Sequence, residues 1–165
     1  MLTRDILDIT RIEGHRLDLN KEKFDISEVI ASAVYDTSRR IEDGDIKFEY
    51  TPSKILIKAD RMRVSQVISN LLSNAVKFTK QGTVYITSDN KDGQAIVSVT
   101  DTGSGIDPEI MPRLFTKFTS RSQTGTGLGL FISKSIIEAH GGRMWAENNK
   151  DRRGATVSFR LPLES

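Results

Sequence analysis

A strand pattern that runs directly into two glycine clusters is the feature that most constrains how this chain can fold. Residues 98–133 read SVTDTGSGIDPEIMPRLFTKFTSRSQTGTGLGLFIS, which begins with strand-like alternation and ends with a helical pattern. The glycines of the two clusters are Gly103 and Gly105, and then Gly125, Gly127 and Gly129. Because glycine costs backbone entropy, such clusters indicate that the chain turns tightly or approaches another group closely.

Composition narrows the class of protein. The chain has 165 residues, enough for one domain with a core, and its 24 basic and 22 acidic residues give a net charge of +2. This balance gives no support for a nucleic-acid partner. Because the chain has no cysteine, disulfides, thiol catalysis and cysteine-ligated metals are excluded. Neither a signal peptide nor a membrane-spanning run is visible, so we expect a cytoplasmic domain, which leaves open a membrane anchor elsewhere in a longer parent protein.

Apolar periodicity predicts a mixture of helices and strands. Helices are expected at residues 1–14, 26–43, 61–78, a short stretch after 108, and 128–140. Strands are expected at residues 17–24, 46–50, 54–59, 83–90, 94–101, 143–149 and 154–163. Asp25 and Asp60 are the expected N-caps of the second and third helices, and the Asp-Gly in KDGQ predicts a tight hairpin. Neighbouring strands joined by hairpins favour an α+β two-layer sandwich.

The first helix carries an apolar stripe but has no capping residue before it. Its stripe consists of Leu2, Ile6, Ile9 and Ile12, and Gly14 is its expected end. We interpret residues 1–14 as the end of a longer helix in the parent protein. The alternative is a natural N-terminal amphipathic helix.

A polar line follows the third helix beside its apolar face. Asn70, Asn74 and Lys77 are spaced i, i+4 and i+7, so they share one side of the helix. An amide oxygen suits Mg²⁺, which takes few protein oxygens and keeps water and phosphate oxygens, and a lysine suits phosphate. The alternative is an ordinary solvated face.

The glycine clusters suit the two ends of a nucleotide. Asp101 ends an apolar strand directly before the first cluster, where its carboxylate can accept a hydrogen bond from the exocyclic amine of adenine. The second cluster opens a helix, whose free N–H groups and positive dipole end suit phosphate. The polar run between the clusters is a candidate lid, in which Lys117 and Arg121 are within reach of anionic phosphates.

Other glycine motifs do not fit. The sequence has no G-x-x-x-x-G-K-[ST] phosphate loop, no protein-kinase loop with H-R-D and D-F-G, and no Rossmann fingerprint. One rival remains, because DTGS after an apolar strand is similar to the active-site loop of aspartic proteases. Such an enzyme needs two carboxylates, so this chain would have to act as a homodimer.

Four segments in order resemble the motifs of the ATP-binding domain of sensor histidine kinases. NLLSNAVKFT is similar to the family's asparagine box, DTGSGI to its first glycine box, LFTKF to its phenylalanine box and GTGLGL to its second glycine box. HGG and GATVSFRLP match the closing segments. The wider superfamily includes gyrase, MutL and the heat-shock chaperone ATPases. The resemblance implies the Bergerat fold, in which a mixed, mostly antiparallel sheet packs on about three helices.

The resemblance also implies roles for individual residues, with ATP and Mg²⁺ as cofactors. Asn74 corresponds to the magnesium ligand, and Asp101 to the carboxylate that binds the adenine amine. Residues implied in phosphoryl transfer are Asn70, Lys77, Lys117 and Arg121. Residues implied in nucleotide binding are Asn74, Phe78, Asp101, Gly103, Gly105, Ile106, Gly125, Thr126, Gly127, Leu128, Gly129 and Thr156, the last joining Asp101 at the adenine through water.

Position 70 separates the branches of this superfamily. Its ATPases place a glutamate there to activate water, whereas an amide such as that of Asn70 is not a general base. The resemblance therefore implies transfer of the γ-phosphoryl group to a histidine on a separate dimeric helical hairpin, in two-component signalling with a response regulator. Neither His15 nor His140 stands in a phosphoacceptor context, so self-labelling is not expected.

The resemblance also divides the chain. Residues 1–14 are expected to be the end of the dimerisation hairpin, and residues 15–165 the catalytic domain. The parent is expected to be a homodimer and this chain mainly a monomer that binds ATP or ADP. A nucleotide-binding regulatory module without transfer activity is the alternative function.

Overall fold

Five strands form the main sheet, in the order β2-β4-β5-β7-β6. The computed structural model describes residues 2–14, 17–41, 44–119 and 127–164. The strands of this sheet are β2 (Ile46–Tyr50), β4 (Gly82–Lys91), β5 (Gln94–Asp101), β6 (Arg143–Asn148) and β7 (Ala155–Pro162). The β2–β4 pair is parallel and the other pairs are antiparallel. A separate antiparallel ribbon consists of β1 (Lys21–Asp25) and β3 (Leu56–Asp60).

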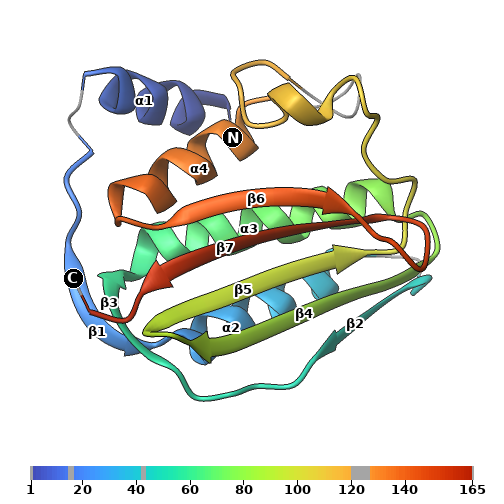
Figure 1. Ribbon diagram of the computed structural model, residues 1–165, viewed down its shortest axis with the longest axis horizontal. Helices are drawn as coiled ribbons and strands as arrows, with labels where there is room; N and C mark the ends of the chain where they lie inside the picture. The colour runs from blue at the N-terminus through green and yellow to red at the C-terminus, as the bar shows by residue number, and fades with distance from the viewer. Residues whose placement is uncertain (1, 15–16, 42–43, 120–126, 165) are drawn as a thin grey trace.

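One face of the main sheet is covered by helices (Figure 1). The covering helices are α2 (Ile26–Arg39), α3 (Arg61–Phe78) and α4 (Gly129–Ala139). Alternate residues of β5 and β7, such as Val97, Val99 and Phe159, point into this layer and are buried, because side chains alternate between the faces of a strand. The predicted α+β two-layer sandwich with a mixed sheet is confirmed.

The predicted helix caps are present. Asp25 Oδ1 accepts hydrogen bonds from the backbone N–H groups of Ser27, at 3.0 Å, and Ile55, at 3.1 Å. Asp60 Oδ1 accepts from Arg63 N at 3.1 Å, while its other oxygen accepts from Asn20 N at 3.0 Å. Each cap therefore fixes the start of a helix and also ties it to a neighbouring segment.

Two predicted boundaries and one predicted helix were wrong. The first strand begins at Lys21 rather than at residue 17, and α2 ends at Arg39, short of residue 43. The short helix expected after residue 108 is only a 3₁₀ turn, η1 (Met111–Arg113). Pro112 in this turn lacks the N–H group that a continuing helix requires.

Helix α1 (Leu2–Glu13) lies outside the helix layer, beside α4 (Figure 1). Ile9 and Ile12 pack against the core as the stripe predicts, but Ile6 is 54% exposed. The buried position on this helix is taken by Asp8, which is 3% exposed. The stripe therefore predicted the helix but not the residue that anchors it.

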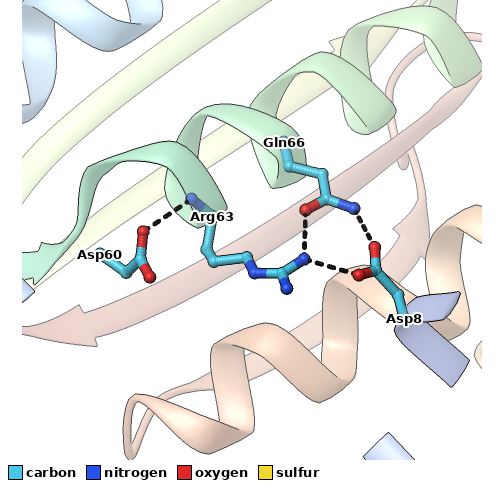
Figure 2. Close-up of polar contacts among 4 residues, drawn as sticks. All are labelled: Asp8, Asp60, Arg63 and Gln66. Carbon is cyan, nitrogen blue, oxygen red and sulfur yellow. Dashed lines mark hydrogen bonds and ion pairs between the residues drawn. The ribbon is translucent and has the colours of Figure 1, made fainter. Parts of the chain in front are cut away.

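The anchor of α1 is a polar network with α3 (Figure 2). Arg63 Nη1 donates to Asp8 Oδ1 at 2.9 Å and to Gln66 Oε1 at 2.9 Å. Gln66 Nε2 in turn donates to Asp8 Oδ2 at 2.8 Å. Both carboxylate oxygens of Asp8 are thus paired with α3, which offsets the cost of burying this charge.

Candidate functional site

A cavity of about 390 Å³ lies between the C-terminal end of α3 and the loop that follows β5. Its lining residues are Phe78, Ser104, Gly105, Ile106, Asp107, Pro108 and Ile110. The structure thus brings Phe78 of the asparagine-box segment together with Gly105 and Ile106 of the first glycine cluster, three residues that the sequence assigned to one site.

Asp101 ends β5 at the start of the cavity loop and is 3% exposed. Its Oδ1 accepts hydrogen bonds from the backbone N–H groups of Gly103, at 3.0 Å, and Ala155, at 3.2 Å. Two donors on one oxygen hold the carboxylate in a fixed orientation, because charge-assisted hydrogen bonds are shorter and stronger than neutral ones.

Gly103 serves a contact within the protein. A Cβ atom at this position would lie 1.9 Å from the backbone oxygen of Phe78. The loop after β5 therefore packs directly on the last residue of α3, which sets the width of the cavity. The glycine thus permits a close approach of the loop to the helix, one of the uses expected of a glycine cluster.

The polar line on α3 runs from the contact with α4 out to solvent. Asn70 Nδ2 donates to Ser133 Oγ at 3.1 Å and to Gly129 O at 3.4 Å, which joins α3 to the first turn of α4. Asn74 is half-buried and Lys77 is exposed. These three side chains therefore line the side of α3 that leads toward the second glycine cluster.

The described part of the second glycine cluster packs on the base of the predicted lid. A Cβ atom on Gly127 would lie 2.5 Å from the backbone of Phe118, and Leu128 is buried. Gly129 is the first residue of α4. The remaining predicted residues of this segment, Arg121, Gly125 and Thr126, lie outside the described residues.

Lys117 is held by α1 in this structure. Its ammonium group pairs with the carboxylate of Glu13 and lies 5.6 Å from the centre of the Phe131 ring. Phosphate contact by Lys117, as the sequence predicts, therefore requires the side chain to leave Glu13. The contact links the base of the lid to a helix far away in sequence.

Thr156, which the resemblance joins to Asp101 through water, forms direct hydrogen bonds with two other side chains, and its water-mediated role stays a prediction. Its hydroxyl donates to Asn149 Oδ1 at 2.7 Å and lies 2.9 Å from the hydroxyl of Thr100, on the sheet face opposite the helices. The direct neighbour of the Asp101 carboxylate on β7 is the backbone N–H of Ala155, one residue earlier.

The sequence analysis missed two asparagines where β6 ends. Asn149 Nδ2 donates to the backbone oxygen of Asp101 at 2.9 Å, and the Asn148 side chain bonds both backbone groups of Ile106. The consecutive asparagines in WAENN were the available signal, since this residue type favours hydrogen bonds to the backbone of loops.

In residues 2–14, 17–41, 44–119 and 127–164, no group of three or more His, Asp or Glu side chains is arranged to hold a metal ion. Within the same part of the chain, no helix has both the length and the apolar character needed to cross a membrane.

Comparison with known proteins identifies the family. Residues 59–165 match the family described as histidine kinase-, DNA gyrase B-, and HSP90-like ATPase. The chain belongs to this family. Sensor protein FixL of Bradyrhizobium diazoefficiens is 42% identical over 127 residues, which are 74% of this chain and 25% of that relative. The chain therefore spans about a quarter of the length of this curated relative.

Solved structures of this ATPase family have the same fold. Full-length ShkA in complex with AMPPNP superimposes with a TM-score of 0.86 and 31% identity, covering 98% of this chain and 35% of that one. The nucleotide-free catalytic domain of histidine kinase ThkA superimposes with a TM-score of 0.79 and 33% identity, covering 88% of this chain and 97% of that one. ThkA in complex with response regulator protein TrrA superimposes with a TM-score of 0.77 and 30% identity, covering 98% of this chain and 48% of that one. The predicted resemblance to histidine kinase catalytic domains is confirmed.

Proposed function

We propose that this chain is the catalytic domain of a sensor histidine kinase and that it binds Mg-ATP in the cavity beside Asp101. The observation that carries the proposal is the buried Asp101 carboxylate, oriented by two backbone N–H groups at the start of the cavity loop. A fixed acceptor beside a cavity suits the amine of adenine. The match of ShkA, solved with AMPPNP, supports a nucleotide in this fold.

The residues around the cavity divide between the two ends of the nucleotide. Asp101, Phe78 and Ile106 would contact adenine, together with Leu128 beside the lid. The first turn of α4, beginning at Gly129, would bind phosphate through its free N–H groups.

The side of α3 that faces this turn would hold the metal ion. The amide oxygen of Asn74 suits Mg²⁺, which needs only one or two protein ligands when phosphates supply others. The ion would neutralise phosphate charge. Lys77, one turn further along α3, would meet the phosphates directly.

Asn70 favours phosphoryl transfer over hydrolysis. Its amide is bonded to Ser133 and Gly129 and cannot act as a general base for water. His140 is buried with both ring nitrogens in hydrogen bonds, so it is a poor phosphoryl acceptor. The acceptor histidine would lie on a separate hairpin, where the γ-phosphoryl group leaves ADP and bonds to the imidazole nitrogen.

The remaining partners follow from the same proposal. Helix α1 would be the end of the dimerisation hairpin, and residues 15–165 the catalytic domain. A response regulator would receive the phosphoryl group, as supported by the solved complex of ThkA with TrrA. The parent would be a cytoplasmic or membrane-anchored homodimer, and this chain a monomer.

Calorimetric titration with ATP and ADP, with Mg²⁺ and with a chelator, tests the proposal. Asp101→Asn should weaken binding about ten- to a hundredfold, because a charged hydrogen bond contributes about 1.5–3 kcal/mol. Asp18→Asn, at an exposed position, is the matched control and should bind normally. Absence of adenine-dependent binding by the folded wild type would overturn the proposal.

A trans-phosphorylation assay then separates the two candidate functions. A matched hairpin that carries the acceptor histidine should become labelled from ATP in the presence of this chain. Binding without transfer would leave the nucleotide-binding regulatory module as the function. The aspartic protease alternative has no support, since its single Asp-Thr-Gly belongs to the cavity loop of this ATPase family.

A further inference from the structure

We infer that Asn148 is a positioning residue that holds the wall of the adenine cavity and thereby sets the preference for adenine over guanine. This inference rests on the proposed function. Asn148 is the last residue of β6, and it does not line the cavity of about 390 Å³. It acts on a residue that does, Ile106.

The side-chain amide of Asn148 pairs with Ile106 as a neighbouring strand would. Its Oδ1 accepts from Ile106 N at 2.7 Å, and its Nδ2 donates to Ile106 O at 2.9 Å. The orientation of the amide is unambiguous, because the flipped amide would oppose donor to donor and acceptor to acceptor. One side chain therefore satisfies both backbone groups of a loop residue that is 3% exposed.

Gly105 makes room for this amide. A Cβ atom on Gly105 would lie 3.0 Å from Asn148 Oδ1, closer than ordinary contact, and the backbone there has φ +81°. The Asn148 amide thus lies where any other residue at position 105 would carry its Cβ atom. Gly105 and Ile106 also line the cavity. The amide supports the cavity wall from behind.

The next residue holds the other end of the same loop. Asn149 Nδ2 donates to Asp101 O at 2.9 Å. Two consecutive asparagines therefore fix the loop at its first residue, Asp101, and at Ile106. This two-point attachment, together with the packing of Gly103 on Phe78, sets the distance between the Asp101 carboxylate and the cavity wall.

The expected consequence is base selectivity. Adenine has an amine donor at the position where guanine has a carbonyl oxygen. A carboxylate held at the correct position therefore accepts a hydrogen bond from the adenine amine and repels the guanine oxygen. A loop that moves would let the base shift away from Asp101. Loss of the Asn148 bonds should therefore weaken ATP binding more than GTP binding.

Asn148→Asp is the sharpest variant. It keeps the acceptor for Ile106 N but places a carboxylate oxygen against Ile106 O. The Kd for Mg-ATP should rise about tenfold, equivalent to about 1.4 kcal/mol, and the ATP:GTP preference should fall several-fold. Asn90→Asp, the same change at an exposed position on β4, should leave both values unaltered.

The outcomes are distinct. Folded Asn148→Asp with an unchanged ATP:GTP preference, including equal losses for both nucleotides, would overturn the inference and leave Asn148 a structural residue. Wild type that binds no adenine nucleotide would overturn the proposed function and the inference with it. If Asn148→Asp does not fold, Asn148→Ala is titrated instead. If that also fails, rapid exchange of the Ile106 amide hydrogen in the wild type would overturn the inference, and slow exchange would support it.

Discussion

At the scale of single residues, the site depends on a glycine, Gly103, at a position that has no room for a side chain. Gly103 brings the cavity loop onto the end of α3, because any Cβ there would lie 1.9 Å from the oxygen of Phe78. The obstacle is backbone, which cannot rotate away as a side chain can. The loop and the helix would have to separate to admit even a methyl group.

We therefore expect Gly103→Ala to reduce the free energy of unfolding by about 1–3 kcal/mol, the usual cost of overpacking. Gly129→Ala is the control, since its Cβ would lie 3.9 Å from the nearest atom, Asn70 Cγ. It should be neutral or stabilising by up to about 1 kcal/mol, because alanine is the better helix former. Urea unfolding of both variants measures the difference, and equal stabilities would show that the loop adapts.

The residues that the sequence could predict are those whose chemistry is local. Asp25 and Asp60 were predicted as caps because a carboxylate before an apolar helix has a defined use within three residues. Asp101 was predicted because it ends a strand before a glycine cluster. The hydrogen bonds of Thr156 to Asn149 and Thr100 could not be predicted, since one residue decides which face of β7 a side chain occupies.

At the scale of elements, α1 is attached by a buried charge in addition to the apolar contacts of Ile9 and Ile12. Asp8 is buried against Arg63 and Gln66 of α3, while Ile6 and Leu7 remain exposed. A pattern of apolar residues cannot reveal such an anchor. A buried charge is tolerated only when it is paired, and its partner here lies on a helix that is distant in the sequence. Helix α1 and the packing of Ile9 and Ile12 were predictable, but the polar anchor was not.

Asp8→Asn should loosen α1 without unfolding the domain. Arg63 would lose its charged partner, and a hydrogen bond to a charged group contributes about 1.5–3 kcal/mol, so local opening should become about ten- to a hundredfold more frequent. Amide hydrogen exchange along residues 5–13 is the measurement. Asp18→Asn, at an exposed position, is the control. Unaltered protection of α1 in Asp8→Asn would contradict the assignment.

The pair of Lys117 with Glu13 places α1 in competition with phosphate. The two side chains are 37% and 55% exposed, so the pair contributes about 0–1 kcal/mol and is weakened by salt. Glu13→Gln should therefore raise ATP affinity by up to about fivefold at low ionic strength. Glu138→Gln, which removes an exposed partner of Lys134 on α4, is the matched control. Equal or weaker ATP binding by Glu13→Gln would refute the competition.

At the scale of the whole molecule, the layers were predictable and the sheet order was not. The Asp-Gly turn predicted the β4–β5 hairpin, and Asp92 and Gly93 adopt the positive φ angles that such a turn requires. The parallel pairing of β2 with β4 joins strands separated by β3 and α3, which no local pattern encodes. The cavity likewise forms between α3 and a loop that begins two strands later.

His140 connects the ends of several of these elements. It lies at the C-terminal end of α4, where its Nδ1 donates to Ile136 O at 2.8 Å. Its Nε2 accepts from the backbone N–H of Asp60 at 3.0 Å, at the junction of β3 and α3. Burial lowers the pKa of His140, and Lys21 on β1 adds to this effect, while Asp60 and the bond to Ile136 oppose it.

Stability should consequently fall as the solution becomes acidic. The unfolded chain takes up a proton on His140 near pH 6.5 and the folded chain only at lower pH, so the contribution of the neutral ring is complete above pH 6.5 and is lost below it. A single proton limits the slope to about 1.4 kcal/mol per pH unit. The free energy of unfolding, measured with urea at pH 7.5 and at pH 5.5, should differ less between the two pH values for His140→Gln than for the wild type. Equal differences would mean that His140 does not control this transition, because the carboxylates titrate mainly at lower pH.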